Sequence, residues 1–275
     1  MKIVAFIDLS LYAHSVIDHT VWLAREKQAS VELVNIVSPN ELAASNLAPV
    51  HPGGAMLLHQ DDTLDAKVAE LARQGRERLD QARRLLNEAG VYDVSTRLLE
   101  GHISRTMVHA ASPASIIIMG KRGEQADLAR LPLGSNLERL ARGSKVPVLA
   151  VSRSFRPIKR MMVAVEVESA APAVNTLASG VVPNYPLDLL HVGDRTDIAL
   201  QTLEQAETKL RDAGFEVKTR IEPGVAQTVV PERVVLDEID LLAVSAFGSS
   251  RLRSMILGSL TSEFLRACQV PVLLC

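Results

Sequence analysis

The chain contains one stretch twice: VSTRLLEG at residues 94–101 and VKTRIEPG at residues 217–224. A second pair follows in the same order, with KVPVLAV at 145–151 and QVPVLLC at 269–275. The two pairs are separated by 123 and 124 residues. A preserved order at a nearly constant offset indicates that one structural unit is used twice in this chain of 275 residues.

The two copies differ in length after their second apolar segment. LVNIV at 33–37 matches LLHVG at 189–193 at an offset of 156, which then falls to 124. The first copy therefore carries about 32 extra residues after Val37. Because this segment is rich in Pro, Gly, Asn and His, residues 38–62 are predicted to form a loop, which could serve as a lid.

Within each copy, β-branched apolar segments alternate with segments of helical periodicity. In the first copy, strands are predicted at 2–7, 31–37, 94–99, 115–119 and 146–151. A helical pattern that includes Leu79, Ala82 and Leu86 ends at Gly90, and another helix fits 103–111. This alternation predicts α/β architecture with two tandem, doubly wound, five-stranded parallel sheets.

The copies are predicted to form domains at residues 1–153 and 159–275, joined by a short basic linker that contains Pro157. The final strands VPVLAV and VPVLLC are edge candidates, and an exposed apolar edge has to be covered.

Composition excludes several classes of protein. Hydrophobic residues make up 47% and charged residues 23%, which is typical of a globular chain. A net charge of −2 and 3% aromatic residues argue against a nucleic-acid partner. Cys268 and Cys275 form no disulfide framework, and no uncharged stretch can span a membrane, so we expect a cytoplasmic protein without a membrane partner.

Candidate binding residues follow the first and fourth predicted strands. Asp8 ends the first strand, and the fourth runs into the glycine-rich segment 120–123 and then into Gly134-Ser135 at a helix start. A helix start offers free N–H groups to a phosphate, and Asp8 could accept hydrogen bonds from a ribose or hold a metal ion. The alternative interpretation is local: a cap at Asp8, an ordinary turn, and a helix N-cap at Ser135.

Together these segments resemble the universal stress protein family, whose signature is Gly, two residues, Gly, nine residues, Gly-Ser/Thr, a helix and a final V-P-V-L strand. The first copy reads GKRGEQADLARLPLGSNLERLARGSKVPVLAV and the second SAFGSSRLRSMILGSLTSEFLRACQVPVLLC. The resemblance covers nearly the whole chain apart from the insert. It implies a stress-response regulator that binds ATP or ADP, with or without Mg²⁺, and antiparallel pairing of the two copies through their last strands. The nucleotide-binding residues that it implies are Asp8, Ile36, Gly120, Gly123, Gly134, Ser135 and Asn136.

Both copies depart from the family pattern. Ten residues, rather than nine, separate Gly123 from Gly134 in the first copy. In the second copy Ser245 replaces the first glycine, Phe247 lies inside the turn, and Glu166 replaces the strand-one aspartate. We therefore expect the first copy to hold the nucleotide and the second to be degenerate.

Three functions are compatible with these residues. The first is a nucleotide-responsive regulator, in which Lys121, Arg122 and Arg130 either neutralise phosphate charge or face solvent. The second is a module of the same fold that binds another ligand or an unknown protein partner. The third, ATP hydrolysis, has only Asp8 in its support and would be weak. Whether two chains form a homodimer is left open by the sequence.

Overall fold

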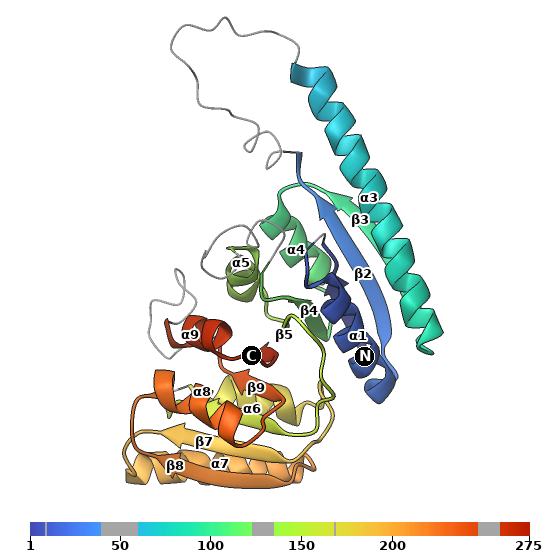
Figure 1. The fold of residues 1–275 in the computed structure, drawn as a ribbon. Helices are drawn as coiled ribbons and strands as arrows, with labels where there is room; N and C mark the ends of the chain where they lie inside the picture. The colour runs from blue at the N-terminus through green and yellow to red at the C-terminus, as the bar shows by residue number, and fades with distance from the viewer. Residues whose placement is uncertain (9, 40–59, 123–134, 168, 247–258) are drawn as a thin grey trace, which may run out of the picture.

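The computed structural model describes residues 1–8, 10–39, 60–122, 135–167, 169–246 and 259–275 (Figure 1). The first domain contains β1 (Lys2–Phe6), α1 (Ala13–Lys27), β2 (Ser30–Val37), α3 (Gln60–Glu88), β3 (Val94–Glu100), α4 (Ile103–Ala111), β4 (Ile116–Gly120), α5 (Ser135–Gly143) and β5 (Val148–Val151). The second contains β6 (Met161–Val165), α6 (Ala170–Ala178), β7 (Leu187–Val192), α7 (Asp197–Asp212), β8 (Val217–Glu222), α8 (Ala226–Leu236), β9 (Leu241–Val244), α9 (Ser259–Ala267) and β10 (Val272–Leu274).

The predicted alternation of strands and helices is confirmed, with one correction in the insert. Helix α3 begins at Gln60, so the last residues of the predicted loop 38–62 are helical. The N-terminal end of α3 extends beyond the rest of the first domain (Figure 1). Residues 40–59 lie outside the described part, and the lid stays a prediction.

The ten strands of the described residues form a single sheet in the order β3-β2-β1-β4-β5-β10-β9-β6-β7-β8. The two halves of this order are mirror images, and within each half the strands are parallel. In each half the strand order reverses direction beside the first strand, between β1 and β4 and between β6 and β9. This reversal is where doubly wound sheets bind ligands, at the carboxyl ends of the strands.

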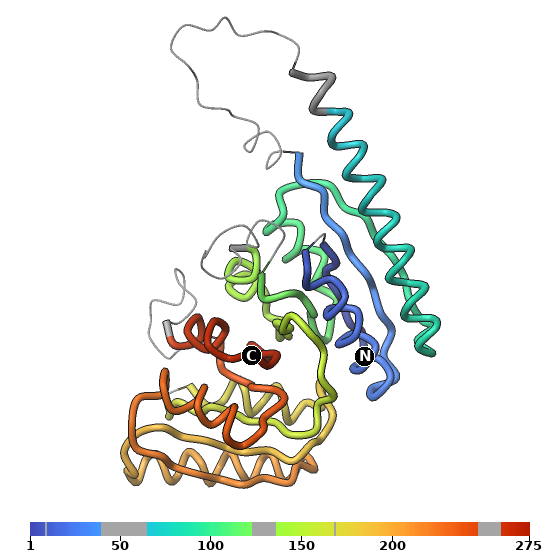
Figure 2. Tube along the Cα trace, in the orientation of Figure 1, coloured from blue at the N-terminus to red at the C-terminus, as the bar shows by residue number. Residues whose placement is uncertain are grey.

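The final strands join the two halves. β5 and β10 are antiparallel, with Ala150 opposite Val272 and Val148 opposite Leu274. Figure 2 shows the C-terminal segment lying against the first domain along this seam. The predicted pairing of the two copies is confirmed, and it covers the apolar edge that each final strand would otherwise expose.

Helices cover both faces of the sheet. On one face, side chains of α1, α3, α6 and α7 share one apolar cluster with alternate strand residues from both domains. On the other face, α4, α5, α8 and α9 share a second cluster, which also spans both domains. Because each cluster crosses the seam, the two domains bury apolar surface against each other as well as pairing strands.

A buried carboxylate on the second strand of each domain provides further evidence of the repeat. In the first domain Glu32 Oε2 lies 2.7 Å from Lys2 Nζ, and its Oε1 lies 2.8 Å from Arg97 Nε. The three residues come from β1, β2 and β3, so the ion pairs join adjacent strands on the face covered by α4.

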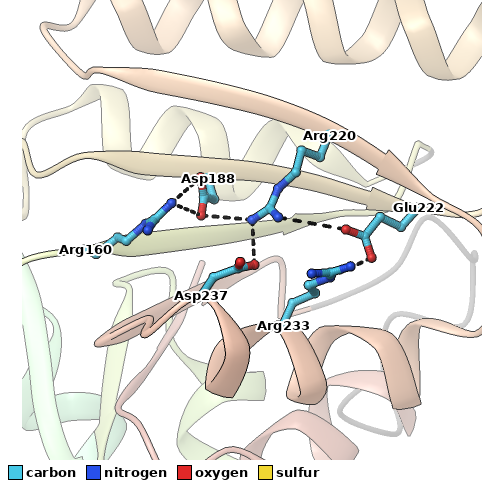
Figure 3. A network of polar contacts seen from close by, with 6 residues as sticks. All are labelled: Arg160, Asp188, Arg220, Glu222, Arg233 and Asp237. Carbon is cyan, nitrogen blue, oxygen red and sulfur yellow. Dashed lines mark hydrogen bonds and ion pairs between the residues drawn. The ribbon is translucent and has the colours of Figure 1, made fainter.

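The matching residues of the second domain form a larger network (Figure 3). Asp188, only 2% exposed, lies 3.0 Å from Arg160 and 3.1 Å from Arg220. Arg220 also lies 2.6 Å from Asp237 at the end of α8. Arg233 of α8 in turn pairs with Glu222 at 2.8 Å. The network therefore joins strands of the sheet to the helix that covers them.

Two aromatic contacts lie near the domain boundary. Trp22 of α1 donates a hydrogen bond from its ring nitrogen to the hydroxyl of Tyr185, at 3.1 Å, and stacks on its ring. Phe155 of the linker packs edge-on against His19 of α1. Both contacts hold the second domain and the linker against α1. Among the described helices, none has the length and apolar content needed to cross a membrane.

Candidate functional site

The backbone register brings three of the predicted site residues to one edge of the sheet. β1 pairs with β2 through Phe6 and Val34, and with β4 through Ala5 and Ile118. Two residues further on, Asp8 is level with Ile36 and lies one residue past Gly120. These three positions therefore meet at the carboxyl edge, at the reversal of strand order.

The Asp8 side chain is held within its own loop. Its Oδ1 accepts hydrogen bonds from the backbone N–H of Ser10, at 3.1 Å, and from the Ser10 hydroxyl, at 2.5 Å. The Ser10 hydroxyl accepts in turn from the N–H of Tyr12, which directly precedes α1. Asp8 therefore orders the loop before α1, but it does not cap the helix, whose N-cap Tyr12 has no side-chain capping hydrogen bond.

Gly120 is required by a close contact within the protein. A Cβ at this position would lie 2.7 Å from the Cβ of Tyr12, which is too close for any side chain. The glycine lets the end of β4 pass directly beneath the residue that precedes α1. Tyr12 therefore lies next to Gly120, one of the residues for which the family resemblance implies nucleotide binding.

Helix α5 carries the remaining described site residues at its start. Ser135 is its first residue and Asn136 its second. Asn136 Oδ1 is buried and has no hydrogen-bond partner among the described residues, which is costly for an amide oxygen. Gly123 and Gly134 lie outside the described residues, as does Arg130, so their predicted roles stay predictions.

The lysine in the glycine-rich segment lies elsewhere than expected. Lys121 is 5% exposed, and its ammonium group donates to the carbonyl oxygens of Cys268 and Val270, each at 2.7 Å. Both carbonyls follow α9 of the second domain. Burial lowers the pKa of Lys121 to about 8. The interpretation of Lys121 as a phosphate-neutralising or solvent-facing residue is wrong, because its positive charge is used at the domain seam.

The matching carbonyls of the first domain are satisfied differently. Lys121 corresponds to Ala246 in the second copy, and the carbonyl that matches Val270 is that of Val146. The hydroxyl of Ser144 donates to the Val146 carbonyl at 3.2 Å. The seam is therefore asymmetric, with a lysine reaching across it from the first domain and a local serine on the other side.

In the second domain, the residue that matches Gly120 makes hydrogen bonds within the protein. Ser245, at the place of Gly120, donates a short hydrogen bond to the carbonyl of Ser169 and accepts from the N–H of Ala173. Ala170 stands where the first domain has Tyr12. Where the helix start meets the end of the fourth strand, the first domain has a large residue on the helix side and a glycine on the strand, Tyr12 and Gly120. The second domain has a small residue on the helix side and a larger one on the strand, Ala170 and Ser245.

The carboxylate of the second domain is also held locally. Glu166 accepts a hydrogen bond from the hydroxyl of Ser169 at 2.9 Å. With Ser245 bound to the same loop, the end of β6 is tied to the start of α6 by side chains. The degeneracy of the second copy at the nucleotide motif stays a prediction, because Asp8 of the first copy is held in a similar way by Ser10.

One feature of the carboxyl edge was not predicted from the sequence: a polar side chain on the second strand of each domain. The amide nitrogen of Asn35 on β2 donates to the carbonyl of Ile7 at 2.7 Å. The matching His191 on β7 uses Nδ1 to contact the carbonyl of Val165 at 3.0 Å. Each side chain joins the carboxyl ends of the first two strands of its domain. The signal was a polar residue inside an otherwise apolar strand at equivalent positions of the two copies.

The fold and this edge define a tandem of two doubly wound α/β domains, each with a reversal of strand order beside its first strand. The model of the universal stress protein family matches residues 1–152 and 193–275, and the chain belongs to that family.

Relatives that match nearly the whole chain support this assignment. Universal stress protein Slr1230 from Synechocystis is 27% identical over 97% of this chain and 96% of its own length. A universal stress protein structure from Archaeoglobus fulgidus superposes with a TM-score of 0.72 at 20% identity, covering 100% of this chain and 97% of that one. A putative universal stress protein from Pseudomonas aeruginosa gives a TM-score of 0.60 at 16% identity, over 99% and 92% of the two chains. The two solved structures support the fold alone.

Proposed function

We propose that the first domain binds ATP or ADP and that the protein is a nucleotide-responsive regulator of the stress response with little or no catalysis. The observation that carries this proposal is the register that brings Asp8, Ile36 and Gly120 together at the carboxyl edge. The family motif assigns a nucleotide to the same three positions.

Each residue has a distinct role in this proposal. Asp8 accepts hydrogen bonds from the ribose, and the half-buried Ile36 contacts the adenine ring. The start of α5, with Ser135, faces the phosphates, because the free N–H groups and dipole of a helix start favour negative charge. Mg²⁺, where present, is carried by the phosphates. Catalysis is minor because Asp8, the one carboxylate assigned to the site, is assigned to the ribose and not to a reacting phosphate.

The amide oxygen of Asn136 supports a polar ligand at the start of α5. This Oδ1 is buried without a partner among the described residues, and rotation of the amide exchanges the oxygen for the NH₂ group. A phosphate oxygen beside that NH₂ group would satisfy the orphaned position. The matching residue of the second domain is Leu260, which cannot make such a bond.

Asn136→Leu tests the proposal, because it gives the first domain the residue of the second. We expect ATP binding, measured by isothermal titration calorimetry, to weaken by about tenfold, the value of one charge-assisted hydrogen bond. Ser259→Ala, at the second domain's motif, is the matched control and should leave affinity unchanged. Equal ATP affinity in the wild type and Asn136→Leu, with both proteins folded, would contradict a phosphate site at the start of α5.

A second function, binding of another ligand or of a protein partner, is favoured by Tyr12, which packs against Gly120 within the protein. Mass spectrometry of small molecules released from the denatured protein separates the two functions. One ATP or ADP per chain supports the nucleotide site. No released nucleotide, together with no heat on titration with Mg-ATP, supports the alternative.

A further inference from the structure

The second domain contains a pocket away from the nucleotide motif. It has a volume of about 520 Å³ and lies between α7 and β8, where β7 and β8 end. Its lining residues come from three places. They are Gly193, Asp194 and Arg195 after β7, Leu200, Leu203, Glu204 and Glu207 on α7, and Thr219, Arg220, Ile221 and Pro223 on and after β8. The residues that match the nucleotide site, Glu166 and Ser245, are not among them.

A difference between the two domains accounts for the space. In the first domain, α3 crosses the sheet at Gly75, where a Cβ would lie 2.5 Å from Asn35 Oδ1 and 2.9 Å from Leu98 Cδ1. The repeat aligns Gly75 with Ala199, and Asn35 with the larger His191. A helix with a methyl group at that crossing, above an imidazole, cannot approach the sheet as closely. The gap opens beside β8, the strand that matches the one bearing Leu98.

The charges of the pocket are mostly negative. Glu204 and Glu207 lie one turn apart on α7, and Asp194 lies at the end of β7. Both oxygens of Glu207 are used, one by Arg211 at 2.6 Å and the other by the Thr219 hydroxyl at 2.6 Å. Within the described residues, the exposed carboxylate of Glu204 makes no ion pair, so its charge remains for a ligand.

The cations nearby do not cancel this charge. The Arg220 guanidinium lies on the opposite face of the sheet, where Asp188 and Asp237 hold it (Figure 3). Arg195 is the one other cation among the lining residues, which include the three carboxylates of Asp194, Glu204 and Glu207. Apolar side chains form the rest of the lining, and Leu200 is 37% exposed to the solvent there.

We propose that this pocket binds a small organic amine, with its apolar body against Leu200, Leu203 and Ile221 and its ammonium group beside Glu204. Apolar walls with a few polar groups that orient the ligand are typical of small-molecule sites. A cation is favoured because the unpaired carboxylate of Glu204 attracts an ammonium group more strongly than a neutral head group and repels an anionic one. The site is independent of the nucleotide proposed for the first domain.

The test uses 2-phenylethylamine as the probe, with 2-phenylethanol and 3-phenylpropionate as neutral and anionic comparators of similar shape. NMR titration of the isotope-labelled full chain should show shifts confined to α7, β8 and the turn after β7. We expect the amine to bind at least fivefold more tightly than either comparator. Equal binding of the three probes, tighter binding of the anion, or no shifts in these segments would overturn the proposal.

Two variants, one on α7 and one at the matching position of α3, test which carboxylate binds the ammonium group. Glu204→Gln should weaken amine binding at least fivefold, whereas Asp80→Asn, at the matching position of α3, should leave it unchanged. Leu200→Ser should weaken all three probes by a similar factor, because it removes apolar wall without changing charge. Amine binding that is unaffected by Glu204→Gln would place the site elsewhere.

Discussion

A buried histidine shows how one residue can make stability depend on pH. His19 is 0% exposed, and its Nδ1 lies 2.7 Å from the carbonyl oxygen of Ser15. Since a carbonyl only accepts, Nδ1 carries the proton, and Nε2, which is buried without a partner in the described part of the chain, carries none. Burial lowers the pKa of His19 to about 4, although the contact with Ser15 partly opposes it. The matching residue of the second domain is Leu177, which is also fully buried.

We predict that His19 makes the free energy of unfolding decrease as the pH falls from about 6.5 to about 4. In that range the unfolded chain binds the proton and the folded chain does not, so protonation favours unfolding. A pKa difference of this size corresponds to about 3 kcal/mol. His19→Leu should flatten the free energy of unfolding across this window in urea titrations. His14→Gln, an exposed histidine on the same helix, should keep the wild-type slope; a wild-type slope in His19→Leu would refute the assignment.

At the scale of elements, strands and helices were largely predictable because their patterns are local. The segments that became β3, α4 and β4 carry β-branched runs or helical spacing that no distant contact overrides. The start of α3 was missed because the residues before it are rich in loop-forming types. The direction of Lys121 could not be predicted, since its partners Cys268 and Val270 lie 147 and 149 positions away. The contact of Tyr12 with Gly120 was missed for the same reason.

The buried ion pairs on the second strands are also properties of elements. We expect Asp188→Ala to lower the free energy of unfolding by about 3 kcal/mol, because it leaves Arg160 and Arg220 without their buried partner. Arg73→Ala, which breaks ion pairs on the exposed face of α3, is the control and should leave the unfolding midpoint nearly unchanged. Denaturant titration of both variants measures the difference. Similar midpoints would show that the Asp188 network contributes no net stability.

At the scale of the molecule, the two domains are joined by the β5–β10 pair, the shared apolar clusters and Lys121. The repeat in the sequence predicted the tandem arrangement, and the apolar final strands, together with the family resemblance, predicted the pairing. The asymmetry of the seam was not predictable, because the partners of Lys121 lie in the other copy.

Replacing Lys121 tests whether its two hydrogen bonds hold the domains together. We predict that Lys121→Met lowers the free energy of unfolding by about 2 kcal/mol, as expected for charged hydrogen bonds lost in a buried place. Amide hydrogen exchange should accelerate in α9 and β10 while β7 and β8 keep their protection. Lys145→Met, an exposed lysine just before β5, is the control. Uniform acceleration in all strands would show a global loss of stability without a specific role at the seam.

The antiparallel seam has a consequence for how the protein can diverge. In a dimer of identical chains, every substitution beside the two-fold axis occurs twice, so both sides have to tolerate it together. Two copies in one chain are free of that restriction. Lys121 and the equivalent residue Ala246 differ accordingly. The seam is therefore directional: a side chain of the first domain donates hydrogen bonds to backbone carbonyls of the second. A duplicated protein can in this way assign different tasks to two halves that began as equals.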